Sequence, residues 1–265
     1  MSPDLLLKAA VLGLVEGATE FVPVSSTGHL IVVSNWLGLL DERTKAFDIF
    51  IQLGAILAIV WLYRGRLGRA MLAARHEPRS RRFLGSLFIA FLPAAVIGFL
   101  AHDWIKARLF NPTVVAVALV AGGILILLIE RWAPTPRVSD VTEVPPRTAW
   151  GIGLAQVLSL IPGTSRSGAT ILGGFALGLS RTAATEFSFF LAIPVLLAAT
   201  AYDLLKSWSI LVPADAPVFA VGFVVSFVSA LVVVRAFLSY VSHHSFSAFA
   251  RYRIAFGIMV LLTQA

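Results

Sequence analysis

The stretch EGATEFVPVSSTGH, residues 16–29, places two glutamates, a run of hydroxyl side chains and a histidine inside an apolar part of the chain. Pro23 stops a helix that enters this stretch, because proline has no backbone N–H and clashes with the preceding turn. The apolar runs around it, 5–22 and 27–39, are too short or too broken to cross a bilayer separately. Non-helical backbone at membrane depth is tolerated only where protein or a water-filled cavity satisfies it. The stretch therefore predicts a re-entrant helical hairpin with a polar tip.

The whole chain has the composition of a membrane protein. Of its 265 residues 58% are hydrophobic and 13% are charged, whereas soluble domains carry about 25% charged residues. Its apolar runs are helix-sized and do not alternate, which excludes a β-barrel. The predicted fold class is an all-α polytopic membrane protein with a single membrane domain, 1–265. About six runs are long enough to span a bilayer: 47–63, 84–101, 113–131, 187–205, 217–238 and 249–265.

A second broken region lies past the middle of the chain. Apolar runs at 149–161 and 167–178 are separated by IPGTSRSG, in which a proline and a glycine stop the helix. Neither run alone reaches across a bilayer. This region predicts a second re-entrant hairpin.

The two broken regions resemble each other in sequence. GLVEGATEFVPVSSTG, residues 13–28, aligns with GLAQVLSLIPGTSRSG, residues 153–168. Weak internal similarity of this kind is typical of transporter-like membrane folds. The chain is therefore interpreted as two repeats, approximately 1–133 and 148–265.

Positive charge between the apolar runs orients the repeats. The segment 64–82 carries seven arginines, whereas the corresponding segment of the second repeat, 203–215, carries one lysine. The arginine-rich side is expected to be cytoplasmic, and the segment 235–253 with Arg235, Arg251 and Arg253 is assigned to the same side as a loop. This predicts inverted repeats with both termini outside, so that the two hairpins enter from opposite faces and their tips form one site. The net charge of +7 could suggest a nucleic-acid partner, but the basic residues cluster in the loops between the apolar runs, as orientation signals do. Nucleic acid is therefore not expected as a partner.

Three further features bear on chemistry and processing. The chain has no cysteine, which excludes disulfides and thiolate metal ligands. Its first apolar run carries Lys8 and Glu16 and lacks a small-residue cleavage site, so a removable signal peptide is not expected. Asp48 and Glu186 occupy similar places in the two repeats and are interpreted as structural partners for nearby basic residues.

Glu16 and Glu20 are the acidic pair of the first hairpin. Four residues apart on a helix, their side chains share a face. Like charges repel at that spacing, and a membrane interior raises the cost of ionisation, so the pair needs a cation, a shared proton or water. Hard cations such as Mg²⁺ or Ca²⁺ choose oxygen ligands, and one held here would attract a phosphate.

The loop after Pro23 carries the hydroxyls of Ser25, Ser26 and Thr27 and leads to His29. A histidine is often structural, but here it lies three residues after a serine and near two carboxylates. Serine, histidine and an acid together can activate a hydroxyl for nucleophilic attack.

The segment PGTSRSGAT, residues 162–170, predicts an anion cradle. Its proline and glycine stop one helix, and Ser167 or a neighbour can cap the next, so backbone N–H groups point into the break. Arg166 adds a planar cationic fork suited to phosphate oxygens. The hydroxyls available beside it are those of Thr164, Ser165, Ser167 and Thr170.

These two motifs, EGATEFVPVSSTGH and PGTSRSGAT, resemble the signatures of the bacterial undecaprenyl-pyrophosphate phosphatase family, also called the bacitracin-resistance protein family. The resemblance covers nearly the whole chain, including FSFFLAIP after the second motif. It implies a hydrolase of the bacterial inner membrane that converts undecaprenyl pyrophosphate to undecaprenyl phosphate and inorganic phosphate. That reaction recycles the lipid carrier of cell-wall peptidoglycan synthesis and confers resistance to bacitracin.

The resemblance also implies roles for single residues. Glu16 and Glu20 would hold a divalent metal or manage protons, Ser26 and His29 would be nucleophile and base, and Arg166 with Ser165 would clamp the pyrophosphate. Ser25, Thr27, Ser167 and Thr170 complete the expected phosphate-binding set. The site would face the periplasm, and the expected partners are the polyprenyl pyrophosphate substrate and membrane lipids, with a homodimer left open.

A membrane carrier is the main alternative function. Inverted repeats with paired broken helices are the layout of secondary carriers, and the same cradle could move an anion or flip a phosphorylated lipid. Phosphate release by the purified protein separates the two functions. The sequence also leaves open whether Ser26, His29 or water is the nucleophile.

Overall fold

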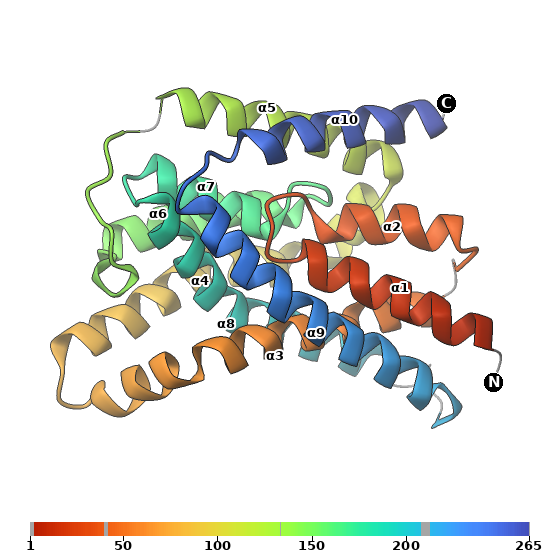
Figure 1. Cartoon of the computed structure of the whole chain (residues 1–265), viewed down its shortest axis with the longest axis horizontal. Helices are drawn as coiled ribbons and strands as arrows, with labels where there is room; N and C mark the ends of the chain where they lie inside the picture. The colour runs from red at the N-terminus through yellow and green to blue at the C-terminus, as the bar shows by residue number, and fades with distance from the viewer. Residues whose placement is uncertain (1–2, 40–41, 133, 208–212, 265) are drawn as a thin grey trace.

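The computed structural model describes residues 3–39, 42–132, 134–207 and 213–264. Within these ranges the chain is helical apart from its connections, and the one isolated β-bridge joins Val138 to Leu179 (Figure 1). The predicted all-α class is confirmed.

Both predicted hairpins are pairs of short helices separated by a break. The first consists of α1 (Pro3–Thr19) and α2 (Ser26–Trp36). The second consists of α6 (Pro146–Val157), which ends in the short 3₁₀ turn η2 (Leu158–Leu160), and α7 (Arg166–Ala176). In both pairs the second helix begins within three residues of the predicted start and packs against the first.

In the described part of the chain, the remaining α-helices are six longer ones. Among the residues that the structure describes, five segments are long and apolar enough to cross a membrane, and they lie on α3, α4, α5, α8 and α9, at the places of five predicted runs. The sixth run, 249–265, forms α10 up to Gln264, and Arg251 and Arg253 near its start make it too polar to join these five. The bounds are α3 Glu42–Ala73, α4 Pro78–Leu109, α5 Pro112–Trp132, α8 Arg181–Ser207, α9 Ala216–Val241 and α10 Ser247–Gln264.

The connections between these helices are shorter than the charge pattern suggested. The helices α3 and α4 have 32 residues each, about 48 Å of helix, so they extend beyond a hydrocarbon core of about 30 Å and carry arginines on their ends. The prediction that 235–253 is a loop is wrong, because α9 continues to Val241 and α10 begins at Ser247. Arg235 therefore lies on α9, and Arg251 and Arg253 lie on α10, where Arg253 has an exposed fraction of 1%.

The hairpins pack on different long helices. Helix α1 lies against α9, and α6 lies against α4, while α3 packs on α8 and α5 runs along α10. In Figure 1, α1 begins and α10 ends at the right, whereas the turn between α3 and α4 lies at the far left. The 3₁₀ turn η4 (Pro213–Asp215), which precedes α9, lies at the right. The arginine-bearing turn between α3 and α4 and the turn η4 therefore lie at opposite ends of the molecule.

Of the two acidic residues interpreted as structural, Glu186 has a basic partner among the described residues. Glu186 accepts from Arg66 at 3.1 Å and so ties α8 to α3. The Oδ1 atom of Asp48 is buried without a hydrogen-bond partner among the described residues. The structure therefore supports the structural reading for Glu186 alone.

Close contact between α1 and α9 depends on glycine. A Cβ added at Gly17 would meet the backbone of Ser226 and Ala230 and the hydroxyl of Ser229. Small residues let helix backbones approach closely inside membranes, where packing rather than hydrophobicity drives association.

The Gly17→Ala variant is expected to be less stable by about 1–3 kcal/mol, because the added methyl overpacks a contact with backbone. Its melting temperature in detergent, followed by circular dichroism, should fall by several degrees. Gly65→Ala on α3 is the matched control, since a Cβ there meets nothing within 4 Å. Equal melting temperatures for the two variants would contradict this account of the α1–α9 contact.

Candidate active site

The two helix breaks have the same unusual backbone. Ser25 has φ 73° and Ser165 has φ 75°, and within the described ranges they are the only non-glycine residues with positive φ. Each serine caps the helix that follows it: Ser25 Oγ accepts from Gly28 N at 3.4 Å, and Ser165 Oγ accepts from Gly168 N at 3.0 Å. Such backbone costs roughly 1–3 kcal/mol and persists only where the surroundings enforce it. Both breaks are therefore held in a fixed conformation.

The tips of the two hairpins touch. Ser167 Oγ donates to the carbonyl of Val22 at 2.8 Å, and it lies 3.0 Å from Ser165 Oγ. Arg166 Nη2 reaches Glu20 Oε1 at 2.9 Å, an ion pair between two nearly buried side chains. Residues about 145 positions apart in the sequence thus form one polar cluster.

Glu20 lies at the centre of this cluster. Its Oε1 faces Arg166, and its Oε2 accepts a hydrogen bond from Ser26 Oγ at 2.5 Å. Ser26 and Arg166 are the first residues of α2 and α7, so the positive ends of two helix dipoles also flank the carboxylate. The arrangement gives Ser26 a base for its proton, in a site whose other groups attract anions.

A second set of contacts fixes the Arg166 side chain. Its Nη1 donates to the carbonyl of Ser188 at 3.0 Å, and its guanidinium lies 5.6 Å from the centre of the Phe21 ring. Thr170 Oγ1 lies 2.7 Å from Ser188 Oγ and donates to the carbonyl of Arg166 at 3.0 Å. Thr170, which is predicted to bind phosphate, therefore also links the Arg166 backbone to Ser188.

His29 has partners other than Ser26. Its Nδ1 lies 2.7 Å from the carbonyl of Ser25, which can only accept, so Nδ1 carries the proton. In the neutral ring Nε2 then accepts from the Tyr252 hydroxyl at 2.6 Å, and the imidazole stacks on Phe256 at 4.3 Å. The hydroxyl of Ser26 turns instead to Glu20, and α10 supplies the second partner of the histidine.

Sequence reasoning missed Ser188 and Tyr252. Ser188 lies on α8 and Tyr252 on α10, at separations of 22 and 223 residues from the residues that they contact. The motif FSFFLAIP contains Ser188 but gives no signal for its partner. Nothing in the spacing of Tyr252 points to His29.

Glu16 is buried completely and isolated. Neither of its carboxylate oxygens has a hydrogen-bond partner among the described residues. A buried carboxylate without a partner needs a proton or a cation. No group of three or more His, Asp or Glu side chains in the described ranges is arranged to hold a metal, so the fit to a hard cation rests on Glu16 and Glu20.

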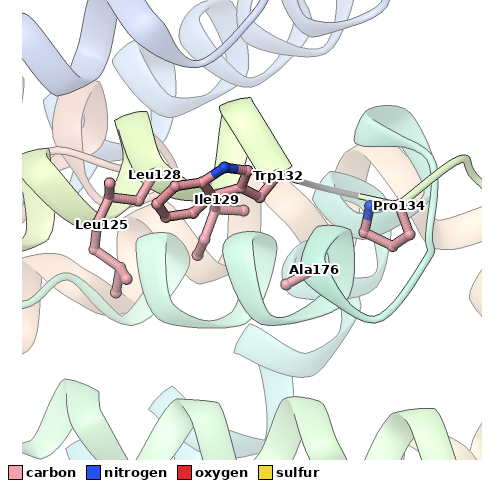
Figure 2. Close-up of a pocket in the computed structure, with 6 residues that line it drawn as sticks. All are labelled: Leu125, Leu128, Ile129, Trp132, Pro134 and Ala176. Atoms are coloured by element: carbon pink, nitrogen blue, oxygen red, sulfur yellow. The ribbon is translucent and has the colours of Figure 1, made fainter.

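The remaining predicted phosphate ligands differ in exposure. Ser25 and Ser165 are buried and used as caps, whereas Thr27 is half-buried. An apolar pocket of about 280 Å³ lies apart from all of them, between the end of α5 and the end of α7 (Figure 2). None of its lining residues is polar enough for phosphate chemistry: Leu125, Leu128, Ile129, Trp132, Pro134 and Ala176.

Comparison with known proteins identifies relatives of the whole chain. Residues 9–259 match the family described as bacitracin resistance protein BacA. An undecaprenyl-diphosphatase of Aromatoleum aromaticum is 55% identical over 263 residues, which cover 99% of this chain and 96% of the relative. An undecaprenyl-diphosphatase of Nitrosospira multiformis is 57% identical over 259 residues, which cover 98% of this chain and 95% of the relative.

Proposed function

The chain belongs to the bacitracin resistance protein BacA family, as its two motifs predicted, and on this premise we propose that it is an undecaprenyl-diphosphatase. It hydrolyses undecaprenyl diphosphate to undecaprenyl phosphate and inorganic phosphate, which recycles the carrier of cell-wall synthesis and gives resistance to bacitracin. The hydrogen bond of Ser26 to Glu20, in a cluster that also holds Arg166, is the observation that supports hydrolysis most strongly.

In the proposed first step, Ser26 Oγ attacks the terminal phosphorus of the diphosphate. Glu20 Oε2 takes the hydroxyl proton, since it already accepts that hydrogen bond at 2.5 Å. The bond from the bridging oxygen to the terminal phosphorus breaks, and undecaprenyl phosphate leaves. Arg166 and the N-termini of α2 and α7 stabilise the negative charge that develops on the transferred group.

In the proposed second step, water attacks the phosphorus of the serine phosphate. Glu20, now protonated, returns its proton to Ser26 Oγ as the P–O bond breaks, and inorganic phosphate is released. His29, held in one tautomer by Ser25 and Tyr252, lies beside this loop with Nε2 as its basic atom. It is the candidate that deprotonates the attacking water, once the substrate displaces the tyrosine hydroxyl.

A divalent cation fits the acidic residues of the first hairpin. Glu16 and Glu20 would hold it, because Glu16 brings two buried oxygens without partners. The cation would neutralise charge on the diphosphate. Within the described ranges no hydrogen bond offsets the burial of the Glu16 carboxylate.

The proposed orientation follows from the two ends of the molecule. The repeats are inverted and the arginine-rich connection of α3 and α4 is cytoplasmic, which the opposite placement of the α3–α4 turn and η4 supports (Figure 1). The first hairpin then enters the bacterial inner membrane from the periplasm, and the site opens to that side. The polyprenyl tail lies in the surrounding lipid.

The first test is phosphate release from undecaprenyl diphosphate by the purified chain in detergent. Wild-type protein is expected to release phosphate, and a chelator is expected to abolish release if a cation completes the site. Arg166→Ala should lower the rate by about 10²-fold or more, because it removes a preorganised donor to the transferred group.

A matched control is Arg137→Ala, whose side chain is exposed outside the membrane helices. It should leave phosphate release unchanged. Absence of release from folded wild-type protein would overturn the hydrolase and favour the carrier, which binds the phosphorylated lipid without cleaving it.

A further inference from the structure

Arg253 is a buried cation whose charge the proposed reaction does not use. Its exposed fraction is 1%, and within the described ranges it has no ion pair with a carboxylate. Its guanidinium donates instead to five backbone carbonyls. These are Leu119 at 3.3 Å, Ala118 at 3.2 Å, Pro23 at 3.2 Å, Gly163 at 2.9 Å and Thr164 at 2.9 Å.

Three of these carbonyls belong to the tips of the hairpins. Pro23 lies in the first break, and Gly163 and Thr164 lie in the second. A helix break leaves carbonyls without helical partners, and buried carbonyls require donors. One planar fork therefore satisfies orphan acceptors of both hairpins at once.

The chain leaves space for this fork. A Cβ at Gly122 on α5 would collide with the Nη2 and Cζ atoms of Arg253, and a Cβ at Gly168 would lie 3.2 Å from Nη1. Burying a charged guanidinium costs free energy unless well-oriented hydrogen bonds compensate for the lost hydration. The guanidinium is fixed between α10, α5 and the two tips.

We propose that Arg253 is a positioning residue that sets the placement of one hairpin tip relative to the other. Pro23 precedes Ser26 by three residues, and Thr164 precedes Arg166 by two. The carbonyl contacts thus fix the nucleophile's loop and the phosphate clamp's loop to one rigid group. The neighbouring Tyr252 contacts His29. A single turn of α10 therefore contacts the loop before Ser26, the loop before Arg166 and the imidazole of His29.

The activity test compares Arg253→Met, Arg253→Lys and the control Arg251→Met, whose side chain is exposed two residues away on α10. It rests on the proposed function. Misplacement of reacting groups by about 1 Å costs on the order of 10²-fold in rate. Arg253→Met should therefore lower kcat for phosphate release by about 10²-fold, with KM nearly unchanged. Arg253→Lys keeps the charge but not the fork, so its kcat should lie between those of wild type and Arg253→Met.

The second readout is independent of activity. Because the chain has no cysteine, Asn35→Cys on α2 and Ile161→Cys in the second break can be spin-labelled together, and both positions are exposed. Pulsed electron resonance then measures the distance between the hairpins. The distribution should broaden or shift in the Arg253→Met background and stay unchanged in the Arg251→Met background.

Each outcome decides the proposal. Lower kcat together with an altered distance distribution supports the role of Arg253 in positioning the hairpin tips. If Arg253→Met does not fold, the same two measurements are made on Arg253→Lys. A folded variant with wild-type kcat, or with lower kcat and an unchanged distribution, overturns it. Absence of phosphate release from wild type would remove the proposed function, while the distance measurement would still test the tie between the hairpins.

Discussion

Ser26→Ala is expected to release phosphate at least about 10⁴-fold more slowly than wild type, because the proposed nucleophile and the hydrogen bond that activates it are lost together. The removed hydroxyl is the one that donates to Glu20 Oε2 at 2.5 Å. Ser26 is buried, and alanine at the first position of α2 suits a helix, so the fold should persist. Initial rates of phosphate release at saturating undecaprenyl diphosphate measure the loss.

Ser34→Ala is the matched control for this variant. Ser34 lies on the same helix, is equally buried, and its Oγ has no hydrogen-bond partner among the described residues. Its phosphate release should equal that of wild type. Full activity in Ser26→Ala would exclude the serine as nucleophile and assign the attack to water or to His29.

Glu20→Gln is expected to lower kcat by about 10³-fold, within the range of losses that follow removal of a general base. The amide keeps the size of the side chain but cannot take the proton of Ser26. It also presents no charge to Arg166, whose Nη2 lies 2.9 Å from Oε1 in the wild type. Single-turnover rates isolate the chemical step from product release.

Glu143→Gln tests whether any loss of a carboxylate has this effect. Glu143 is exposed in the connection between α5 and α6 and pairs at 3.1 Å with Arg79 near the start of α4, and exposed pairs contribute about 0–1 kcal/mol. Its activity should match that of wild type. Comparable losses in the two variants, or an unchanged rate in Glu20→Gln, would contradict the role of Glu20 as base.

The breaks in the helices were predictable because their causes are local. Proline and glycine disrupt helices, and a hydroxyl side chain at the start of a helix can cap it. Pro23 and the PGTSRSG segment therefore predicted both hairpins. The same locality explains the misplaced Arg253. A basic residue near the end of an apolar run usually lies in a loop, and only burial against two hairpin tips shows that this one does not.

The choice of partners inside the site depends on side-chain directions that spacing does not reveal. Ser26 and His29, three residues apart, were expected to act together, yet the positive φ at Ser25 starts α2 so that Ser26 faces Glu20. His29 points to α10 and meets Tyr252. Thr170 is predicted to bind phosphate, and spacing did not reveal that its Oγ1 lies 2.7 Å from Ser188 Oγ on α8, which packs against α7.

The sequence by itself determined the membrane class, the positions of the two hairpins and the family, because composition, helix-breaking residues and short motifs act over a few neighbouring residues. Only the tertiary structure decided that Glu20 joins Ser26 to Arg166, that Tyr252 and Ser188 support the site, and that Arg253 donates to both hairpin tips. These contacts join residues that are up to 230 positions apart. Such contacts form only when packing brings separate helices within hydrogen-bonding distance, which is a property of the whole fold and not of any local pattern.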